Sequence, residues 1–146
     1  MNSKYELLLL ENQVCFPTYA VANKILRRYQ PLLKKINLTY TQYITMMVMW
    51  EKEVVNEKDL VNALYLKANT LTAMLGKLKQ KGYIKISRDE NDKRSIIISL
   101  TDEGRKLKEQ AVEVPKTLIE EHWLTDEEVK AFKVLLYKLL KGDWEK

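Results

Sequence analysis

The sequence predicts a mainly α protein, formally α+β because it contains one small two-stranded β element, in a chain of 146 residues. Three observations lead to this fold class. Apolar residues recur at the spacing of amphipathic helices through most of the chain. A single stretch, residues 83–100, is rich in isoleucine on both sides of a charged turn, which is the pattern of a hairpin. The four glycines and three prolines are too few for a β-sandwich with many tight turns.

Composition excludes several classes of protein. Hydrophobic residues make up 46% and charged residues 31% of the chain, so a core can be buried and disorder is not expected. No apolar run reaches the roughly 20 residues of a membrane helix, and the apolar residues 7–10 lack the flanks of a secretory signal. We therefore expect a cytoplasmic protein without a membrane partner. One cysteine and one histidine cannot form an intrachain disulfide or a zinc site, so we expect no structural metal and no cofactor.

Two helices are expected near the start of the chain. The first covers residues 16–35, with Pro17 in its first turn, where a missing N–H costs nothing. The second begins at Thr39, which forms a capping-box pattern with Gln42, each side chain accepting from the other's backbone N–H. Because its body is rich in apolar residues, the second helix is expected to be central to the core.

Two shorter helices follow, separated by a tight break. Asn56 is expected to cap the third helix, which ends near Leu64. The fourth helix is expected to be capped by Asn69 or Thr70 and to end at Gly82, a natural residue after a helix C-terminus. Its apolar stripe consists of Leu71, Met74, Leu75 and Leu78.

Two β-rich stretches come next, residues 83–87 and 95–100, on either side of the charged turn at residues 88–94. They predict a two-stranded hairpin with an exposed tip. Two short helices joined by a tight break and followed by a hairpin have the element order of a winged helix-turn-helix, a DNA-binding fold. We therefore expect a single domain over residues 1–146, with a DNA-binding lobe at residues 39–100.

The C-terminal part predicts two further helices. The first is capped by Thr101, runs to about His122 and is expected to kink at Pro115, because the proline ring clashes with the preceding turn. One face of this helix repeats apolar residues and has no evident partner nearby: Leu107, Ala111, Val114 and Leu118. The last helix begins with a capping-box pattern of Thr125 and Glu128.

The helical segments at the two chain ends are more apolar than a lone domain of this size needs. We therefore expect residues 1–36 and 102–146 to form a dimerisation arm, and the protein to be a homodimer. The dimer would then place two copies of the fourth helix, the candidate recognition helix, about 34 Å apart on a palindromic operator. The alternative is that these helices only cover their own domain.

Excess positive charge is confined to one segment of the chain. The protein has 25 basic and 20 acidic residues, for a net charge of +5. Residues 67–94 contain eight basic and three acidic residues, so this segment carries the whole excess. Such a cationic surface favours a polyanion as partner, nucleic acid before a membrane. The alternative is an ordinary solvated basic face.

Specific DNA contacts can be assigned to the fourth helix and to the hairpin. The N-terminal end of a recognition helix normally meets base edges. The polar residues at that end are Asn69, Thr70 and Thr72. Farther along the same helix are three lysines that can reach DNA phosphates, Lys77, Lys79 and Lys81. The hairpin tip carries Arg88 and Arg94, which fit a narrow minor groove, while ordinary helix-start chemistry is the alternative role of the two threonines.

The chain resembles the MarR family of transcriptional regulators over nearly its whole length. Residues 92–101 (DKRSIIISLT) match the family's D-x-R-…-L-T signature, and residues 71–75 (LTAML) and 38–43 (LTYTQY), with Trp50, also match. The N-terminal LENQVCF, with Tyr19, Tyr29 and Tyr40, resembles the organic hydroperoxide regulator (OhrR) branch of the one-cysteine type. The resemblance implies an obligate dimer that represses a peroxidase gene and leaves DNA when its N-terminal cysteine is oxidised. It also implies that Asp92 orients Arg94.

Cys15 is the candidate redox sensor. A thiol reacts as its thiolate, and Cys15 is expected at the positive end of the first helix, which favours an anion. The resemblance implies that Tyr29 and Tyr40, from this or the partner subunit, donate to the thiolate, with Tyr19 nearby, and that Phe16 walls the peroxide pocket. Oxidation by an organic hydroperoxide would give a sulfenic acid. Without a second cysteine, a low-molecular-weight thiol, another chain's thiol, a backbone amide or over-oxidation would complete the reaction.

Together these features predict a repressor that senses organic hydroperoxides through Cys15 and then releases its operator. Two regulators of the same fold are alternatives: a repressor gated by a non-covalently bound aromatic ligand, and a global oxidant-responsive regulator. A thiol peroxidase is disfavoured, because the chain has no second cysteine and no basic residue beside Cys15, so we expect no enzyme activity. The remaining alternatives are a purely structural helical dimer and, for Cys15, a buried unreactive thiol.

Overall fold

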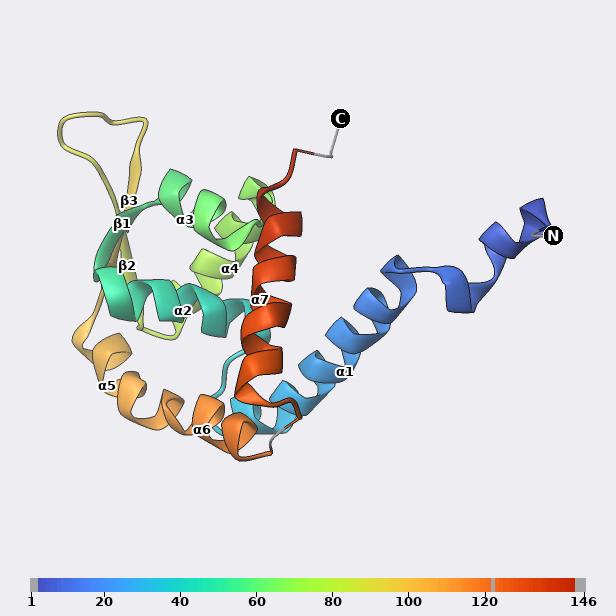
Figure 1. The fold of residues 1–146 in the computed structure, drawn as a ribbon. Coiled ribbons are helices and arrows are strands. Elements are labelled where there is room, and N and C mark those ends of the chain that lie inside the picture. Colours follow the sequence, from blue (N-terminus) through green and yellow to red (C-terminus); the bar gives the residue numbers. More distant parts are fainter. Residues whose placement is uncertain (1–2, 122, 144–146) are drawn as a thin grey trace. The chain divides into compact units, whose positions relative to one another are not determined.

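The computed structural model describes residues 3–121 and 123–143. The chain divides into two compact units, Met1–Val114 and Pro115–Lys146. The first begins with two short 3-10 helices, Lys4–Leu8 and Leu10–Asn12, and continues with α1 (Cys15–Lys34), α2 (Tyr40–Lys52), β1 (Val54–Asn56), α3 (Glu57–Leu64), α4 (Ala68–Gln80), β2 (Ile84–Arg88), β3 (Ile96–Leu100) and α5 (Asp102–Ala111) (Figure 1). The last two helices are α6 (Glu113–Glu120) and α7 (Asp126–Lys141). No helix in the described residues is long and apolar enough to cross a membrane.

α1 and α2 lie where the sequence predicts them. α1 begins one residue before the predicted start, so Pro17 is its third residue, where a missing N–H breaks no helical bond. The capping box of α2 is confirmed: the Gln42 N–H donates to Thr39 Oγ1 at 3.2 Å, and the Thr39 N–H donates to Gln42 Oε1 at 3.1 Å. α2 is the centre of the core, because Met46 and Met49 are fully buried and the helix packs against α1, α3, α4 and α5.

α3 and α4 form a helix-turn-helix pair. Asn56 caps α3 as predicted, with its side-chain Oδ1 accepting from the Asp59 N–H at 2.7 Å. α3 ends at Leu64, and the left-handed backbone of its C-cap residue Tyr65 (φ 55°) turns the chain away from the helix. α4 begins three residues after Tyr65, at Ala68, so the predicted tight break is confirmed.

The start of α4 differs from the prediction, whereas its end and its buried face agree with it. Lys67 is the N-cap residue and makes no side-chain capping bond, so the prediction that Asn69 or Thr70 caps this helix is wrong. Asn69 Oδ1 instead accepts from the Thr70 N–H at 2.9 Å, inside the first turn. α4 ends just before Gly82, which adopts a left-handed backbone (φ 83°). The predicted apolar stripe is buried: Leu71, Met74, Leu75 and Leu78.

The β element has three strands rather than the predicted two. β2 and β3 pair antiparallel as the expected hairpin, with Ile86 opposite Ile98. β1 pairs antiparallel with the other edge of β3, with Val55 opposite the same Ile98, so the strand order is β1-β3-β2. The loop between β2 and β3, with the strand ends that carry it, is the wing, and it projects beyond the sheet (Figure 1).

The long helix predicted after the hairpin is interrupted. Thr101 caps its start as predicted, with Oγ1 accepting from the Gly104 N–H at 3.0 Å. α5 ends at Ala111 and α6 begins at Glu113. Because Pro115 has no N–H for the carbonyl one turn earlier, the break lies just before the proline instead of at it. The predicted helix end at His122 lies outside the described residues.

The apolar face that the sequence left without a partner is buried inside this chain over most of its length. Leu107, Ala111 and Val114 are each at most 6% exposed. Leu107 and Ala111 belong to α5, which packs against α2, and Val114 belongs to α6. The expectation that this face has no local partner is therefore wrong, and the face cannot be used as an argument for a dimer.

α7 lies in the second unit and begins with the predicted capping box. The Glu128 N–H donates to Thr125 Oγ1 at 3.2 Å, and the Thr125 N–H donates to Glu128 Oε1 at 3.0 Å. The bond from the Thr125 N–H lowers the pKa of the Glu128 carboxyl, because it favours the charged form. No residue of α7 is buried. The helix nevertheless carries large apolar side chains: Val129, Phe132, Val134, Leu135, Leu136, Tyr137, Leu139 and Leu140.

Candidate functional site

The predicted DNA-contacting residues of α4 are all exposed. They are Asn69, Thr70, Thr72, Lys77 and Lys79. The small residues Ala73 and Gly76 are exposed as well, so this side of the helix is slim, while the opposite side is packed in the core. A helix with a slim, polar and basic exposed side has the dimensions and charge to enter a DNA major groove about 12 Å wide.

An acidic residue that the sequence analysis did not single out, Glu57, reaches this surface from α3. Thr72 Oγ1 lies 2.9 Å from Glu57 Oε1 and 2.9 Å from the carbonyl oxygen of Ala68. Both neighbours are acceptors, so the Thr72 hydroxyl donates to the protein and its oxygen is left to accept from a ligand. Glu57 and Thr72 are 15 positions apart on different helices, and no local sequence pattern connects them.

Hydrogen bonds within the wing set its shape. Arg88 Nη1 donates to the carbonyl oxygen of Lys93 at 2.8 Å, across the loop. Asp92 Oδ1 accepts from the backbone N–H of Arg94 at 3.1 Å. Asp92 therefore acts on Arg94 through the backbone of the turn. Both residues line a surface cavity of about 410 Å³ where the wing meets α3 and the start of α4.

Lys81 differs from the other lysines of this segment because its side chain is engaged inside the protein. Its Nζ donates to the carbonyl oxygen of Asn37 at 2.5 Å and to Gln42 Oε1 at 3.0 Å. Both acceptors belong to the α1–α2 corner, defined here as residues 35–42. Burial lowers the pKa of the Lys81 ammonium, and the positive charge of Lys77 lowers it further. The phosphate contact expected of Lys81 would require these two bonds to break.

Cys15 is exposed at the first position of α1. This location agrees with the expected position at a helix N-terminus and contradicts a cysteine buried as a small hydrophobe. Phe16 follows it directly, and Tyr19 lies four residues on, where side chains of a helix share one face. Phe16 and Tyr19 are both exposed, so a peroxide can approach this end of the helix from solvent.

Tyr29 and Tyr40 lie in an aromatic cluster that also contains Tyr43 and Trp50. The ring centroids of Tyr29 and Tyr40 are 5.0 Å apart in an edge-on arrangement, and Tyr43 lies 6.0 Å from Tyr29 and 6.3 Å from Tyr40. Trp50 stands edge-on to Tyr43 at 6.4 Å. The sequence analysis gave no site role to Tyr43 or Trp50, although their spacing along α2 puts them, with Tyr40, on one side of that helix.

The phenols of this cluster are held in their neutral form. Burial, with smaller contributions from Tyr40 and Tyr43, raises the pKa of Tyr29 from 10.0 to about 12. Burial also raises the pKa of Tyr40 and, together with Tyr40, the pKa of Tyr43. At neutral pH these hydroxyls are protonated, and each can donate a hydrogen bond to an anion such as a thiolate.

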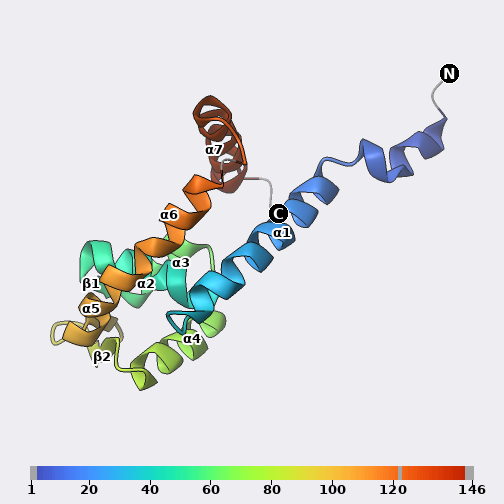
Figure 2. The same cartoon turned by 90° about the horizontal axis from the view of Figure 1, so that it is seen from below.

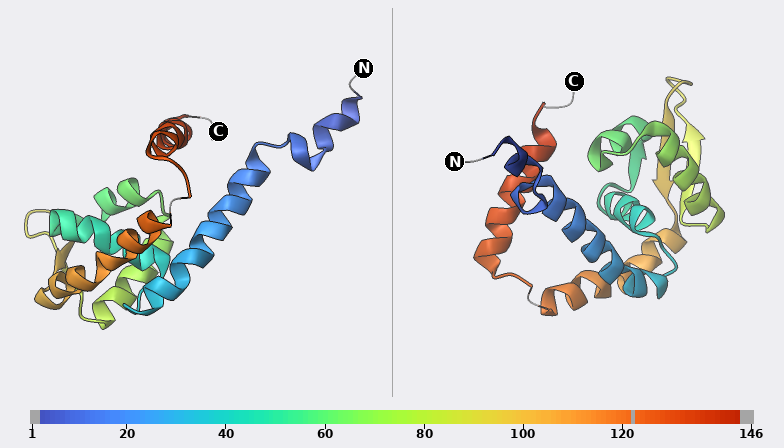
Figure 3. Two further views of the ribbon diagram at one scale, coloured as in Figure 1. Left: turned by 60° about the horizontal axis from the view of Figure 1, so that its bottom comes forward. Right: turned by 90° about the vertical axis from the view of Figure 1, so that its right-hand side faces the viewer.

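One chain does not bring Cys15 and this cluster together. Cys15 and Tyr29 are both in α1, and fourteen residues of α-helix span about 21 Å at 1.5 Å per residue. Figures 2 and 3 show the N-terminal half of α1 extending away from α2, whose first residue is Tyr40. Of the three tyrosines predicted to serve Cys15, only Tyr19 lies within a helical turn of it. The other two can reach a Cys15 thiolate only if it belongs to a second copy of the chain.

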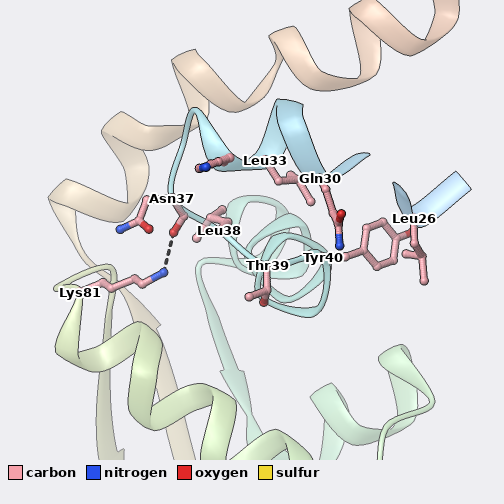
Figure 4. A pocket seen from close by; sticks show the side chains of 9 residues that line it. Leu26, Gln30, Leu33, Asn37, Leu38, Thr39, Tyr40 and Lys81 are labelled. Carbon is pink, nitrogen blue, oxygen red and sulfur yellow. Dashed lines mark hydrogen bonds between the residues drawn. The ribbon is translucent and has the colours of Figure 1, made fainter. Parts of the chain in front are cut away.

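A surface cavity of about 530 Å³ opens at the α1–α2 corner. Leu26 and Gln30 from α1, Leu38 and Tyr40 from the corner, and Lys81 are among the residues that line it (Figure 4). Mixed apolar and amide groups beside a phenol can accommodate a small organic molecule. Within the described residues, no group of three or more histidine, cysteine or acidic side chains could hold a metal ion.

The sequence is similar to known transcriptional regulators. Residues 27–111 match the family model described as Transcriptional regulator SarA/Rot. The organic hydroperoxide resistance transcriptional regulator of Bacillus subtilis (strain 168) is 42% identical over 141 residues, which cover 97% of this chain and 96% of that protein. The HTH-type transcriptional regulator SarZ of Staphylococcus aureus (strain NCTC 8325 / PS 47) is 35% identical over 119 residues, covering 82% and 80% of the two chains.

Solved structures of related regulators are also similar to this chain. The crystal structure of AbfR of Staphylococcus epidermidis is 36% identical, with a TM-score of 0.76, and covers 93% of this chain and 95% of its own. A structure of overoxidised AbfR bound to DNA is 35% identical, with a TM-score of 0.78 and coverage of 94% and 97%. At 23% identity, a MarR mutant from E. coli shares the fold, with a TM-score of 0.77 and coverage of 95% and 99%.

Proposed function

The chain belongs to the MarR-type winged-helix transcriptional regulators, and on this premise we propose that it is an operator-binding repressor switched by oxidation of Cys15 with an organic hydroperoxide. The observation that carries the proposal is the exposed Cys15 at the N-terminus of α1. It occurs in a chain 42% identical to an organic hydroperoxide resistance regulator. A lone thiol accessible to solvent, near a helix N-terminus, has the setting that reactive cysteines require.

The DNA-binding part of the proposal is supported by charge and shape. The exposed side of α4 and the wing lie in the segment that carries the whole net charge of +5. We assign base-edge contacts to Asn69, Thr70 and Thr72, phosphate contacts to Lys77 and Lys79, and minor-groove contacts to Arg88 and Arg94, with Asp92 shaping the wing. Double-stranded DNA is therefore the proposed partner, as it is in the solved complex of the relative AbfR.

A homodimer is supported by two observations that do not involve α5. The N-terminal arm, defined here as residues 3–14 before α1, exposes large apolar side chains, such as Leu7 (77%) and Leu8 (79%). α7 exposes another set of apolar side chains. Clusters of exposed large apolar side chains on a protein surface mark protein–protein contacts. The distance between Cys15 and Tyr29 along α1 also leaves the thiol site incomplete in one chain, so a partner copy must supply Tyr29 and Tyr40. A two-fold dimer would present two α4 helices to a palindromic operator.

The proposed chemistry has two steps. The Cys15 thiolate attacks the distal peroxide oxygen; an S–O bond forms, the O–O bond breaks, the alkoxide leaves and takes up a proton from solvent to become the alcohol, and Cys15 becomes a sulfenic acid. A low-molecular-weight thiol then attacks the sulfur, water leaves and a mixed disulfide forms. Because overoxidised AbfR has been crystallised on DNA, we assign operator release in this chain to the bulkier thiol adduct. Tyr29 and Tyr40 of the partner copy would donate to the thiolate, and Phe16 would line the approach of the peroxide.

A second candidate function is a repressor gated by a non-covalently bound aromatic ligand. The cavity of about 530 Å³ at the α1–α2 corner favours it, because Tyr40 and Lys81 lie in the wall of that cavity and Lys81 is the C-cap residue of α4, which packs against α2. In this case Cys15 would be incidental, and a phenolic ligand would raise the melting temperature without modifying any thiol.

The test is operator release measured together with intact mass. A duplex from upstream of the protein's own gene is titrated with reduced protein, with and without cumene hydroperoxide and cysteine. We expect release of the wild type, with a mass increase of one thiol adduct, and no release of Cys15→Ser. Equal release of the two proteins by peroxide would refute the redox mechanism. Release by an aromatic acid alone would support the second candidate.

A further inference from the structure

The C-terminal end of α4 is joined to the α1–α2 corner by one lysine. Lys81 is the C-cap residue of α4, and its ammonium donates to Asn37 O at 2.5 Å and to Gln42 Oε1 at 3.0 Å. Figure 4 shows this side chain reaching from α4 to the corner. The predicted recognition helix is therefore tied by a cation to the junction of the first two helices.

The position of this cation follows from the ends of two helices. α4 ends at Gln80 and α1 ends at Lys34, and a helix C-terminus carries partial negative charge. Lys81 directly follows the last residue of α4, and Asn37 lies three residues after the last residue of α1. Asn37, which supplies one acceptor, is itself held in a left-handed conformation (φ 54°) by the turn that ends α1. Burial and the positive charge of Lys77 lower the pKa of the Lys81 ammonium, while its two hydrogen bonds favour the charged form.

The same corner contains Tyr40 of the aromatic cluster. Gln42 Oε1 accepts from both Lys81 Nζ at 3.0 Å and the Thr39 N–H at 3.1 Å, so the lysine shares an acceptor with the capping box of α2. Tyr40 directly follows Thr39 in the chain, and the centroid of its ring lies 5.0 Å from the centroid of the Tyr29 ring. A continuous series of contacts therefore runs from Tyr29 through Tyr40 and the capping box to Lys81 and α4.

Cavities lie on two sides of this corner, although its Ile36, Leu38 and Gln42 side chains are buried. The cavity of about 530 Å³ lies on one side, lined by Thr39, Tyr40 and Lys81. A second cavity, of about 290 Å³, lies between the start of α2 and α4 and is lined by Thr39, Gln42 and Lys77. Well-packed interiors resist displacement, and the corner lacks such packing on two sides. The polar bridge of Lys81 is thus one contact, beside the core packing of α2 on α4, through which a movement of the α2 N-terminus reaches the end of α4.

We propose that Lys81 is a positioning residue that holds α4 in its operator-binding orientation and passes a displacement of Tyr40 to that helix. The second half of this statement rests on the redox function proposed above, in which Tyr40 serves the Cys15 of the partner copy. Modification of that thiol would move Tyr40, and the shared acceptor Gln42 would move Lys81 with it. Coupling between two sites of one protein typically changes affinity by about 5- to 150-fold.

The experiment compares Lys81→Met with Lys81→Arg and Lys79→Met on the same upstream duplex. Each protein is assayed for operator Kd over a range of salt concentrations, and for the ratio of Kd before and after cumene hydroperoxide with cysteine. For Lys81→Met we expect Kd to rise about tenfold with the salt slope of the wild type, because no phosphate contact is lost. We expect its peroxide ratio to shrink at least fivefold, and Lys81→Arg, which keeps a cationic donor, to restore both values.

Lys79→Met is the matched control, because Lys79 is an exposed lysine at the same end of the helix. We expect it to lower the salt slope by about one and to keep the peroxide ratio. A Lys81→Met protein with unchanged Kd, or with a slope lowered by about one and an unchanged ratio, would overturn the proposal and make Lys81 a phosphate contact.

Failure of the two proposals can be told apart. If peroxide does not release even the wild type, the redox function fails, while the Kd and salt slope of Lys81→Met still decide whether Lys81 positions α4. Circular dichroism checks that each variant is folded at the assay temperature. If Lys81→Met is not folded, Lys81→Gln, which removes the charge but keeps a polar group, is assayed instead, with the same expectations.

Discussion

At the scale of single residues, Gly104 shows how closely α5 approaches the hairpin. A Cβ placed on Gly104 would clash with the backbone oxygen of Tyr83 and would lie 2.7 Å from Leu100 Cδ1. The carbonyl of Gly104 also accepts from the Trp50 indole at 2.8 Å. Glycine is therefore required here by space, not by backbone angle.

We expect Gly104→Ala to lower the free energy of unfolding by about 2 kcal/mol, because the backbone of β2 must move to admit a methyl group. Gly76→Ala is the control: nothing lies within 4 Å of its Cβ position and the residue is inside α4. This variant should gain about 0.5–1 kcal/mol from helix propensity. Urea denaturation measures both values, and equal stabilities would contradict the close approach.

The raised pKa of Tyr29 predicts a loss of stability at alkaline pH. The neutral phenol is favoured in the folded protein, so the stabilisation is complete below pH 10.0 and is lost as the pH rises through about 12. The full pKa difference corresponds to roughly 2.7 kcal/mol, and solvent screening of this half-buried group reduces the expected loss to about 1 kcal/mol. Unfolding free energies of wild type and Tyr29→Phe, measured between pH 9 and 11.5, test this. We expect the variant's curve to fall less steeply, and parallel curves would contradict it.

The sequence could identify single candidate residues better than it could identify the side chains that those residues contact. Cys15 follows from its position before Pro17 and from the family resemblance, and the structure places it at the first position of α1. The bond from Thr72 to Glu57 and the bridge from Lys81 to Asn37 could not be predicted. Each joins residues on different elements, so it depends on how the helices pack, which local spacing does not encode.

At the scale of elements, the helix starts with a side-chain cap were predicted correctly, whereas the start of α4, which lacks one, was not; α1, also without a capping side chain, was placed within one residue through Pro17. Thr39, Asn56, Thr101 and Thr125 each cap the helix that the sequence assigned to them. α4 starts at Ala68, and its N-cap residue Lys67 makes no side-chain capping bond, so the start of this helix was misplaced. β1 was missed because three residues show no alternation, and its partner β3 lies more than forty residues farther along the chain.

At Asp92 in the wing, the electrostatic effect and the structural effect of a substitution on operator affinity are expected to oppose each other. Removing the negative charge of Asp92 near DNA should tighten binding on electrostatic grounds alone. Its Oδ1, however, holds the backbone N–H of Arg94. We therefore expect Asp92→Ala to weaken operator binding severalfold, and Asp92→Asn, which keeps the acceptor oxygen and loses the charge, to bind at least as tightly as the wild type. Kd measurements at two salt concentrations decide this, and tighter binding by Asp92→Ala would show that charge dominates.

At the scale of the whole molecule, two properties point to an assembly larger than one chain. Cys15 is about 21 Å along α1 from Tyr29, and two sets of large apolar side chains, in the N-terminal arm and in α7, are exposed. The sequence indicated a dimer partly for a wrong reason, since the face of α5 that it left unpartnered packs in its own chain. The apolar chain ends indicated a dimer as well, and the structure adds which side chains of α7 are exposed.

Dimerisation through α7 can be tested by introducing a charge into its apolar surface. Leu135 is 63% exposed, so Leu135→Glu costs little in a monomer but buries an unpaired carboxylate in an interface. We expect sedimentation to shift from a dimer towards the 17.2 kDa monomer, and operator affinity to fall because two linked α4 helices no longer bind together. Lys130→Glu places the same side chain elsewhere on α7 and should remain dimeric. Oxidation of Cys15 by cumene hydroperoxide, followed by intact mass, should also slow in Leu135→Glu, because Tyr29 and Tyr40 of the partner copy are lost. A monomer that oxidises at the wild-type rate would show that Cys15 needs no phenol from a second chain.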